Sequence, residues 1–476
     1  MKYLSSLMAL CLLCIVCHAT IRLPSVISSH MVLQQNSTAK LWGWCAPSEK
    51  IYITTSWNNK TDSITGTSGA RWVAQVQTPA AGGPYTITLK GHNTIVLEDV
   101  LIGEVWVCSG QSNMEWSYRN KLPQIAEELP ACYNRNIRFF HIPKTTADYP
   151  QDNCDAQWAV CDSNALKSFS AVGYFFGKKL NKDLNIPIGL INSSWGGTPA
   201  ETWTPDSIVK NNPALNAAAA KLNTSKGWPI QPGQAYNAMI APVTNFAIAG
   251  AIWYQGESNT TTSATYSQLF TAMIESWRRA WNKELPFYYV QIAPYKYGNR
   301  HIGALLREQQ TKTMSVPNTG MVVITDLVND TNNIHPLNKR DVGERLAGWA
   351  LNKTYNKQDV VYASPLYKNM EVKKGKVYLQ FDHAPNGLEI KGKNATELYV
   401  AGSDRQFYPA QAKLEKGQLV VWSKQVKEPV AVRFGFGNTA MGNLFSKEGL
   451  PVTPFRTDDW RSEERRVGKE CRSRWS

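Results

Sequence analysis

The chain has 476 residues, a formal net charge of +14 and 43% hydrophobic residues, which is typical of a globular protein of two or three domains. The positive charge is spread along the chain without a basic run, which argues against a nucleic-acid-binding protein. The 17 Trp and 20 Tyr residues favour a carbohydrate ligand, because aromatic rings pack against sugar faces.

The first 19 residues have the pattern of a secretory signal peptide. Lys2 supplies the positive charge, and the apolar run from Leu7 to Val16 is too short to span a bilayer. Cys17-His18-Ala19 offers a cleavage site after Ala19. We therefore expect a secreted or periplasmic protein with no membrane contact beyond export.

Residues 20–97 are expected to form an N-terminal β-module that resembles a small sandwich. Short alternating apolar runs are separated by Gly, Pro, Asn and Ser. The predicted strands are Thr38–Trp44, Lys50–Ser56, Arg71–Val76 and Tyr85–Lys90.

Residues 98–357 change to an alternation of strands and helices, which predicts an α/β domain with a parallel sheet covered on both faces. The predicted strands are Val100–Cys108, Ile188–Asn192, Ala247–Tyr254, Phe287–Ile292 and Gly320–Thr325. The predicted helices are Ser168–Leu180, Ala264–Trp281 and Asp341–Leu351.

Residues 358–460 return to a β pattern and are expected to form a C-terminal β-module. Its predicted strands are Val360–Ala363, Val377–Phe381, Leu398–Ala401, Leu419–Trp422 and Val430–Gly435. Residues 461–476 break sharply from the preceding composition and resemble one reading frame of a sequencing adapter, so we interpret them as a non-native tail. The alternative is a basic tail that binds an acidic partner.

Cysteines and histidines give little sign of a metal site. Five cysteines remain between the predicted signal peptide and the tail, and export would permit Cys154, Cys161 and Cys132 to pair. No Cys/His cluster has metal-ligand spacing, so no metal or other cofactor is expected.

Four polar clusters follow predicted strands of the α/β domain. They are Gly110–Met114, Asn192–Thr198, Trp253–Asn259 and Asp326–Leu337. The carboxyl ends of parallel strands carry the chemistry of such sheets, so we expect the clusters to lie together. They supply a serine, a histidine, glycine N–H groups and amides, which are the groups that acyl transfer requires.

The segments Gly-Gln-Ser-Asn-Met, Gln-Gly-Glu-Ser-Asn and Ile-His-Pro, in this order, resemble the sialate O-acetylesterase family of the SGNH hydrolases. The resemblance extends over residues 20–460 and includes Ala304–Glu308 and Pro451–Asp458. It implies a flavodoxin-like SGNH core with accessory β-modules, and release of acetate from O-acetylated sugars without a metal.

The resemblance also implies roles for single residues. Ser112 would be the nucleophile and His335 the general base. The oxyanion hole would combine the Ser112 N–H, an N–H of Gly196 or Gly197, and the Gln255 side chain. Three further side chains of the same clusters are candidates for binding the ester or its sugar: Asn113, Asn259 and Glu257.

The third member of a triad is missing from its usual place. SGNH enzymes usually carry Asp three residues before the histidine, and relatives carry it two residues before, but this chain has Asn332 and Asn333. Asp330 is the nearest upstream carboxylate and Glu257 is another candidate. The alternative is a serine–histidine dyad without an acid.

The leading hypothesis is an exported carbohydrate O-acetylesterase, acting on O-acetylated sialic acid through an acetyl-enzyme. A second hypothesis is an acetylxylan or other polysaccharide acetylesterase with the same serine chemistry. A third, of another class, is a non-catalytic carbohydrate-binding protein on the same fold.

Overall fold

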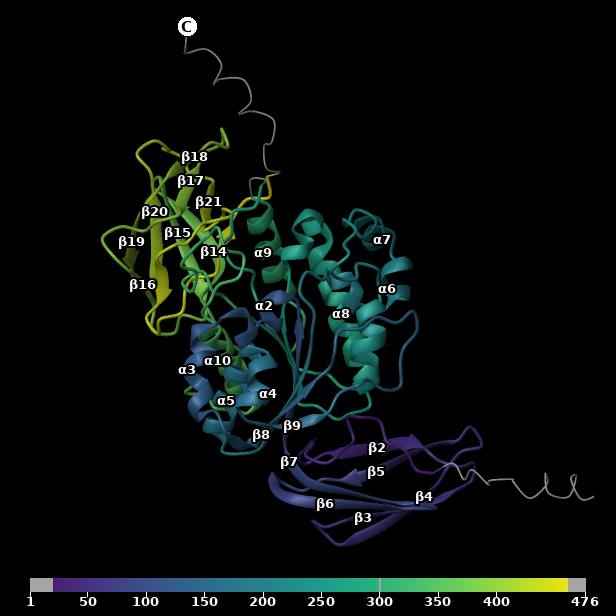
Figure 1. Ribbon diagram of the computed structural model, residues 1–476. Coiled ribbons are helices and arrows are strands. Elements are labelled where there is room, and N and C mark those ends of the chain that lie inside the picture. The colour runs from purple at the N-terminus through teal and green to yellow at the C-terminus, as the bar shows by residue number, and fades with distance from the viewer. Residues whose placement is uncertain (1–19, 299–300, 461–476) are drawn as a thin grey trace, which may run out of the picture.

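The N-terminal region is a pair of β-sheets in the computed structural model, which describes residues 20–298 and 301–460 (Figure 1). β2 (Thr38–Trp44) pairs antiparallel with β5 (Arg71–Gln77). β3 (Lys50–Thr55) pairs antiparallel with β4 (Lys60–Thr65) and β6 (Gly82–Lys90). Burial alternates along β3, so that Ile51 and Ile53 point into the core while Lys50 and Tyr52 face outward. The strands predicted in this region are confirmed.

β7 (Thr94–Gly110) is a long strand that joins this region to the α/β sheet. Its first half pairs antiparallel with β6, and β1 (Val32–Gln34) runs parallel to it at Leu101–Gly103. Its second half lies between two strands of the parallel sheet, and every residue from Val100 onward is buried. The strand therefore runs continuously across residue 97.

The α/β sheet has the strand order β13-β12-β11-β7-β10-β8-β9, and only β9 runs antiparallel to its neighbour. The bounds are β8 (Asn134–His141), β9 (Trp158–Cys161), β10 (Ile188–Ser194), β11 (Gly250–Tyr254), β12 (Phe287–Val290) and β13 (Thr319–Val322). All five predicted strands are confirmed, but β8 and β9 were not expected from the sequence. β8 carries Arg138, which is buried because its guanidinium binds both carboxylate oxygens of Asp99, at 2.6 and 3.1 Å.

Helices cover both faces of this sheet, as the alternating pattern predicts (Figure 1). α5 (Ala171–Leu184) and α10 (Arg340–Trp349) lie on one face, and α8 (Tyr266–Trp281) and α9 (Ile302–Thr313) lie on the other. Along β7, Val105 and Val107 join the core beneath α8, while Trp106 and Cys108 join the core beneath α5 and α10. The three predicted helices are confirmed with shifted ends.

Short helical segments fill the connections. They are α2 (Ser112–Glu115), η1 (Tyr118–Asn120), α3 (Pro123–Glu128), η2 (Leu129–Ala131), α4 (Ser163–Ser168), η3 (Ala200–Trp203), α6 (Asp206–Lys210), α7 (Pro213–Ala219), η4 (Tyr236–Ile240), η5 (Ala241–Val243), η6 (Glu257–Thr265) and η7 (Ala350–Thr354). Two of them, α2 and η6, follow the carboxyl ends of β7 and β11 and carry part of the polar clusters, and η3 begins two residues after the cluster that follows β10.

The C-terminal region is built from small antiparallel sheets around a core of its own. The strands are β14 (Leu366–Lys373), β15 (Lys376–Asp382), β16 (Leu388–Ile390), β17 (Leu398–Ala401), β18 (Phe407–Pro409), β19 (Gln411–Glu415), β20 (Gln418–Trp422), β21 (Ala431–Phe434), β22 (Leu444–Ser446) and β23 (Phe455–Arg456). The strand predicted at Val360–Ala363 is wrong, because this stretch packs against the α/β core without a partner strand. The other four predictions are confirmed.

The predicted signal peptide and the predicted non-native tail lie outside the described residues. The five described cysteines are buried and free, so none of the disulfides considered from the sequence forms. Within residues 20–298 and 301–460, no helix has both the length and the apolar character needed to cross a bilayer.

Candidate active site

Ser112 lies at a sharp turn between β7 and α2. Gly110 ends the strand with φ +137°, and a Cβ atom there would come within 2.2 Å of the Tyr254 carbonyl oxygen. Only glycine fits this turn. Gln111 is the N-cap residue of α2, so Ser112 is the first residue of the helix and lies at the carboxyl edge of the sheet.

His335 reaches Ser112 from the loop between β13 and α10. Its Nε2 atom lies 2.8 Å from Ser112 Oγ, across 223 residues of sequence. Its ring stacks on Trp116, with centroids 4.2 Å apart and planes 24° apart. Burial lowers the pKa of His335 to about 4, with a smaller contribution from the charge of Lys339. The imidazole is therefore neutral at pH 7 and able to accept a proton.

Asp330 does not orient His335, which corrects the expectation of a triad acid at this position. Its exposed carboxylate accepts hydrogen bonds from the backbone and side chain of Asn332, at 2.8 and 3.0 Å. Asn333 instead accepts from the backbone N–H of His335 through Oδ1 at 2.9 Å. Among the described residues, none forms a hydrogen bond with Nδ1 of His335.

The two glycines after β10 lie beside Ser112. The Trp195 N–H donates to the Gly110 carbonyl, and a Cβ atom on Gly196 would lie 3.2 Å from Ser112 Cβ. The Gly196 N–H donates to the Glu115 carboxylate. Gly197 has φ +83°, and a Cβ atom there would overlap the ring of Trp228. Gly196 is thus the glycine that lies against the serine.

Gln255 does not offer a free donor to the serine, contrary to its predicted oxyanion role. Its side chain is fully buried, and Nε2 donates to Asn259 Oδ1 at 2.7 Å and to the Thr198 carbonyl at 3.3 Å. Its Oε1 accepts from the Tyr266 hydroxyl at 2.9 Å. Asn259 is equally enclosed, because Nδ2 donates to Glu201 at 2.8 Å. Both amides brace the loop after β11 and do not face substrate in this structure.

Asn113 and Glu257 form a buried cluster with Lys339. Asn113 Nδ2 donates to Glu257 Oε1 at 2.7 Å, and Asn113 Oδ1 accepts from Lys339 Nζ at 2.6 Å. Burial raises the pKa of Glu257 and lowers that of Lys339 to about 7. Because all three side chains are buried, Asn113 and Glu257 are not placed to bind a sugar.

Sequence reasoning missed Lys339 and Trp116. The signal available was their spacing: Lys339 comes four residues after His335, and Trp116 comes four residues after Ser112. No three His, Cys, Asp or Glu side chains gather into a metal-binding group in the described parts of the chain.

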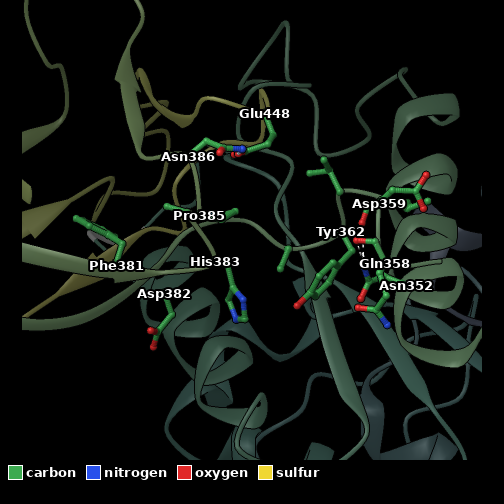
Figure 2. Close-up of a pocket in the computed structure, with 14 residues that line it drawn as sticks. Asn352, Gln358, Asp359, Tyr362, Phe381, Asp382, His383, Pro385, Asn386 and Glu448 are labelled. Carbon is green, nitrogen blue, oxygen red and sulfur yellow. Dashed lines mark hydrogen bonds between the residues drawn. The ribbon is translucent and has the colours of Figure 1, made fainter. Parts of the chain in front are cut away.

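A separate pocket of about 580 Å³ lies where the α/β region meets the C-terminal region (Figure 2). Figure 2 shows Tyr362 and His383 facing each other across it, with Asn352 on one side and Glu448 on the other. None of the predicted site residues lines it. The pocket is therefore separate from the serine–histidine pair.

A parallel sheet covered on both faces, with a serine–histidine pair at its carboxyl edge, is the arrangement of SGNH-type esterases. The family model "Carbohydrate esterase, sialic acid-specific acetylesterase" matches residues 102–352, and the chain belongs to this family. The protein is accordingly an esterase.

Two kinds of relative support this assignment. Sialate O-acetylesterase of Homo sapiens is 30% identical over 389 residues, covering 74% of each chain. Sialate O-acetylesterase of Mus musculus is 28% identical over 414 residues, covering 74% of this chain and 76% of the mouse protein. The crystal structure of a carbohydrate acetylesterase from Xanthomonas citri is similar with a TM-score of 0.85 and 35% identity, covering 93% of this chain and 100% of that one.

Proposed function

We propose that the protein is an exported carbohydrate O-acetylesterase that removes acetyl groups from O-acetylated sialic acid, with Ser112 as nucleophile. The observation that carries the proposal is the 2.8 Å contact between Ser112 Oγ and His335 Nε2 in a member of this family. The sialate O-acetylesterases among its relatives support the choice of sugar. Export rests on the signal-peptide pattern of residues 1–19.

The reaction has two halves. Ser112 Oγ attacks the acetyl carbonyl carbon while His335 Nε2 takes the hydroxyl proton. The ester bond then breaks, the sugar oxygen receives that proton from His335, and the acetyl group stays on Ser112. Water attacks this acetyl-enzyme with His335 again as base, which releases acetate and restores the serine hydroxyl.

The N–H groups of Ser112 and Gly196 are the proposed oxyanion donors. The Ser112 N–H forms no hydrogen bond within the described chain, and the Gly196 N–H is held by Glu115. We infer that the oxyanion replaces the Glu115 carboxylate on Gly196 during the reaction. Glu115 is already paired with Lys144, which keeps its charge compensated when it moves.

The test compares wild type with Ser112→Ala and His335→Ala. Each variant should lose on the order of 10⁴-fold or more in kcat, because both side chains act as one unit. Acetate release is measured on O-acetylated sialic acid and on acetylated xylan, and the melting temperature is measured as a control for folding. Faster acetate release from acetylated xylan by wild type would identify an acetylated polysaccharide as the substrate. Near-native turnover by folded Ser112→Ala would overturn the serine mechanism.

A further inference from the structure

A buried lysine and a buried carboxylate lie on either side of Asn113, the residue that follows Ser112. Lys339 and Glu257 are 1% and 7% exposed, and the Asn113 side chain between them is fully buried. The lysine donates to one end of the Asn113 amide, and the carboxylate accepts from the other. The two bonds fix the orientation of that amide, since its oxygen faces the cation and its nitrogen faces the anion.

The oriented amide also holds the histidine loop. Asn113 Nδ2 makes a second hydrogen bond, 3.1 Å long, to the carbonyl oxygen of Ile334. Asn113 follows Ser112 and Ile334 precedes His335, so this bond ties the serine helix to the histidine loop. The ammonium of Lys339 also lies 5.5 Å from the centroid of the Trp116 ring, on which His335 stacks.

We propose that Lys339 is a positioning residue: with Asn113 and Glu257 it forms a clamp that holds His335 against Ser112, in place of the missing triad carboxylate. The inference rests on the proposed function of Ser112 and His335. In a triad, the acid holds the imidazole through Nδ1. Here the clamp holds the backbone before the imidazole, and Trp116 holds the ring.

Burial lowers the pKa of Lys339 to about 7, and the charge of Glu257 opposes this shift. Glu257 from η6 faces the ammonium. The ring centroid of Tyr254 from β11 lies 5.6 Å from Lys339 Nζ. His335 is the other titratable group that the lysine affects, and its positive charge lowers the pKa of His335. Burial of either ion alone would be costly, so lysine and carboxylate depend on each other.

The test uses Lys339→Met, Lys339→Gln and Asn113→Leu, all in the full chain, with Lys283→Met as the matched control. Lys283 Nζ also donates to a carbonyl, that of Ile248, but at the amino end of the sheet. We expect Lys339→Met and Lys339→Gln to lower kcat about 10²-fold with KM nearly unchanged, because a displaced base affects the reaction more than binding. Lys283→Met should keep wild-type kcat.

The pH profile separates positioning from a purely structural role. Removing the cation should raise the pKa of His335, so the acid limb of kcat/KM should move to higher pH in both Lys339 variants. Asn113→Leu should lower kcat as much as Lys339→Met does, and the double variant should lose no more than either.

Three results would overturn the inference: wild-type kcat in a folded Lys339 variant, an acid limb that stays in place, or losses that multiply in the double variant. Asn113→Leu tests the clamp without altering Lys339, so the proposal stays open to refutation if both lysine variants fail to fold. Failure of the proposed function is a different result, in which wild type releases no acetate or Ser112→Ala remains active.

Discussion

At the scale of single residues, the histidine is held without a carboxylate on its ring. Nε2 binds Ser112, the ring stacks on Trp116, and the backbone N–H binds Asn333. This arrangement gives the two asparagines before the histidine different contacts. Asn333 is part of the support of His335, whereas Asn332 and Asp330 bind each other at the surface.

Substitution of the loop residues should therefore separate their roles. We expect Asn333→Ala to lower kcat by about 10-fold or more, because the His335 backbone loses an acceptor that positions it. Asp330→Asn and Asn332→Ala should stay within a few-fold of wild type. Steady-state kinetics on p-nitrophenyl acetate checks this, and a loss near 10⁴-fold in Asp330→Asn would restore it as the triad acid.

The pH dependence should show an unusually acidic histidine. His335 must be neutral to accept the serine proton, and its pKa is lowered from the ordinary 6.5 to about 4. Activity is present above this pKa and is lost as pH falls through it, so kcat/KM should remain high well below pH 6. Measurements across the range from about pH 3 to 8 provide the check. An acid limb at 6.5 would contradict the burial described here.

At the scale of elements, the loops after β7, β10 and β11 support one another through buried amides. β10 and β11 flank β7 and both pair with it as far as Gly110, so the loops that follow them meet at Ser112. Gln255 lies within this junction. It binds the Thr198 carbonyl of the loop after β10, and it also binds Asn259 of η6 and Tyr266 of α8. The residues that bind these loops together do not themselves touch the serine.

Gln255→Ala should consequently act on stability. The change leaves the Tyr266 hydroxyl without its acceptor, and each buried polar group left unpaired costs about 1–3 kcal/mol. Denaturant unfolding should show a lower free energy of unfolding, while exposed Gln268→Ala should leave it unchanged. If Gln255→Ala keeps native stability but loses much of its kcat, Gln255 acts as an oxyanion donor and the expectation is wrong.

At the scale of the whole molecule, the C-terminal sheets are attached to the helix that supports the site. Arg456 of β23 binds both carboxylate oxygens of Glu308 on α9, at 2.7 and 3.0 Å. Arg307 of the same helix donates to the Gly437 carbonyl. α9 in turn contacts the loop after β11, because Gln310 donates to the Gln255 carbonyl at 3.1 Å. The C-terminal region thereby supports the site from outside.

Arg456→Met should weaken this attachment. Loss of the paired hydrogen bonds to a charged partner is expected to cost about 2 kcal/mol of stability. Lys413→Met is the matched control, because Lys413 pairs with Glu415 on the exposed surface of the same region. Melting temperatures should fall for Arg456→Met and stay constant for the control. Equal melting temperatures would show that the region docks by other contacts.

The sequence by itself determined the fold class, and together with the family resemblance it pointed to the serine and the histidine. Alternating strands and helices follow from local periodicity, and the carboxyl ends of parallel strands share one edge. The family resemblance pointed to Ser112 and His335, and the structure brings their side chains within 2.8 Å of each other.

Only the tertiary structure decided where the side chains of these clusters point. Spacing places Gln255, Asn113 and Glu257 at the correct edge of the sheet, but their hydrogen-bond partners lie up to 226 residues away. β8 was also missed, and it carries the buried Arg138, whose guanidinium binds Asp99, 39 residues earlier. Buried polar groups are positioned by long-range partners, and local sequence patterns do not contain those partners.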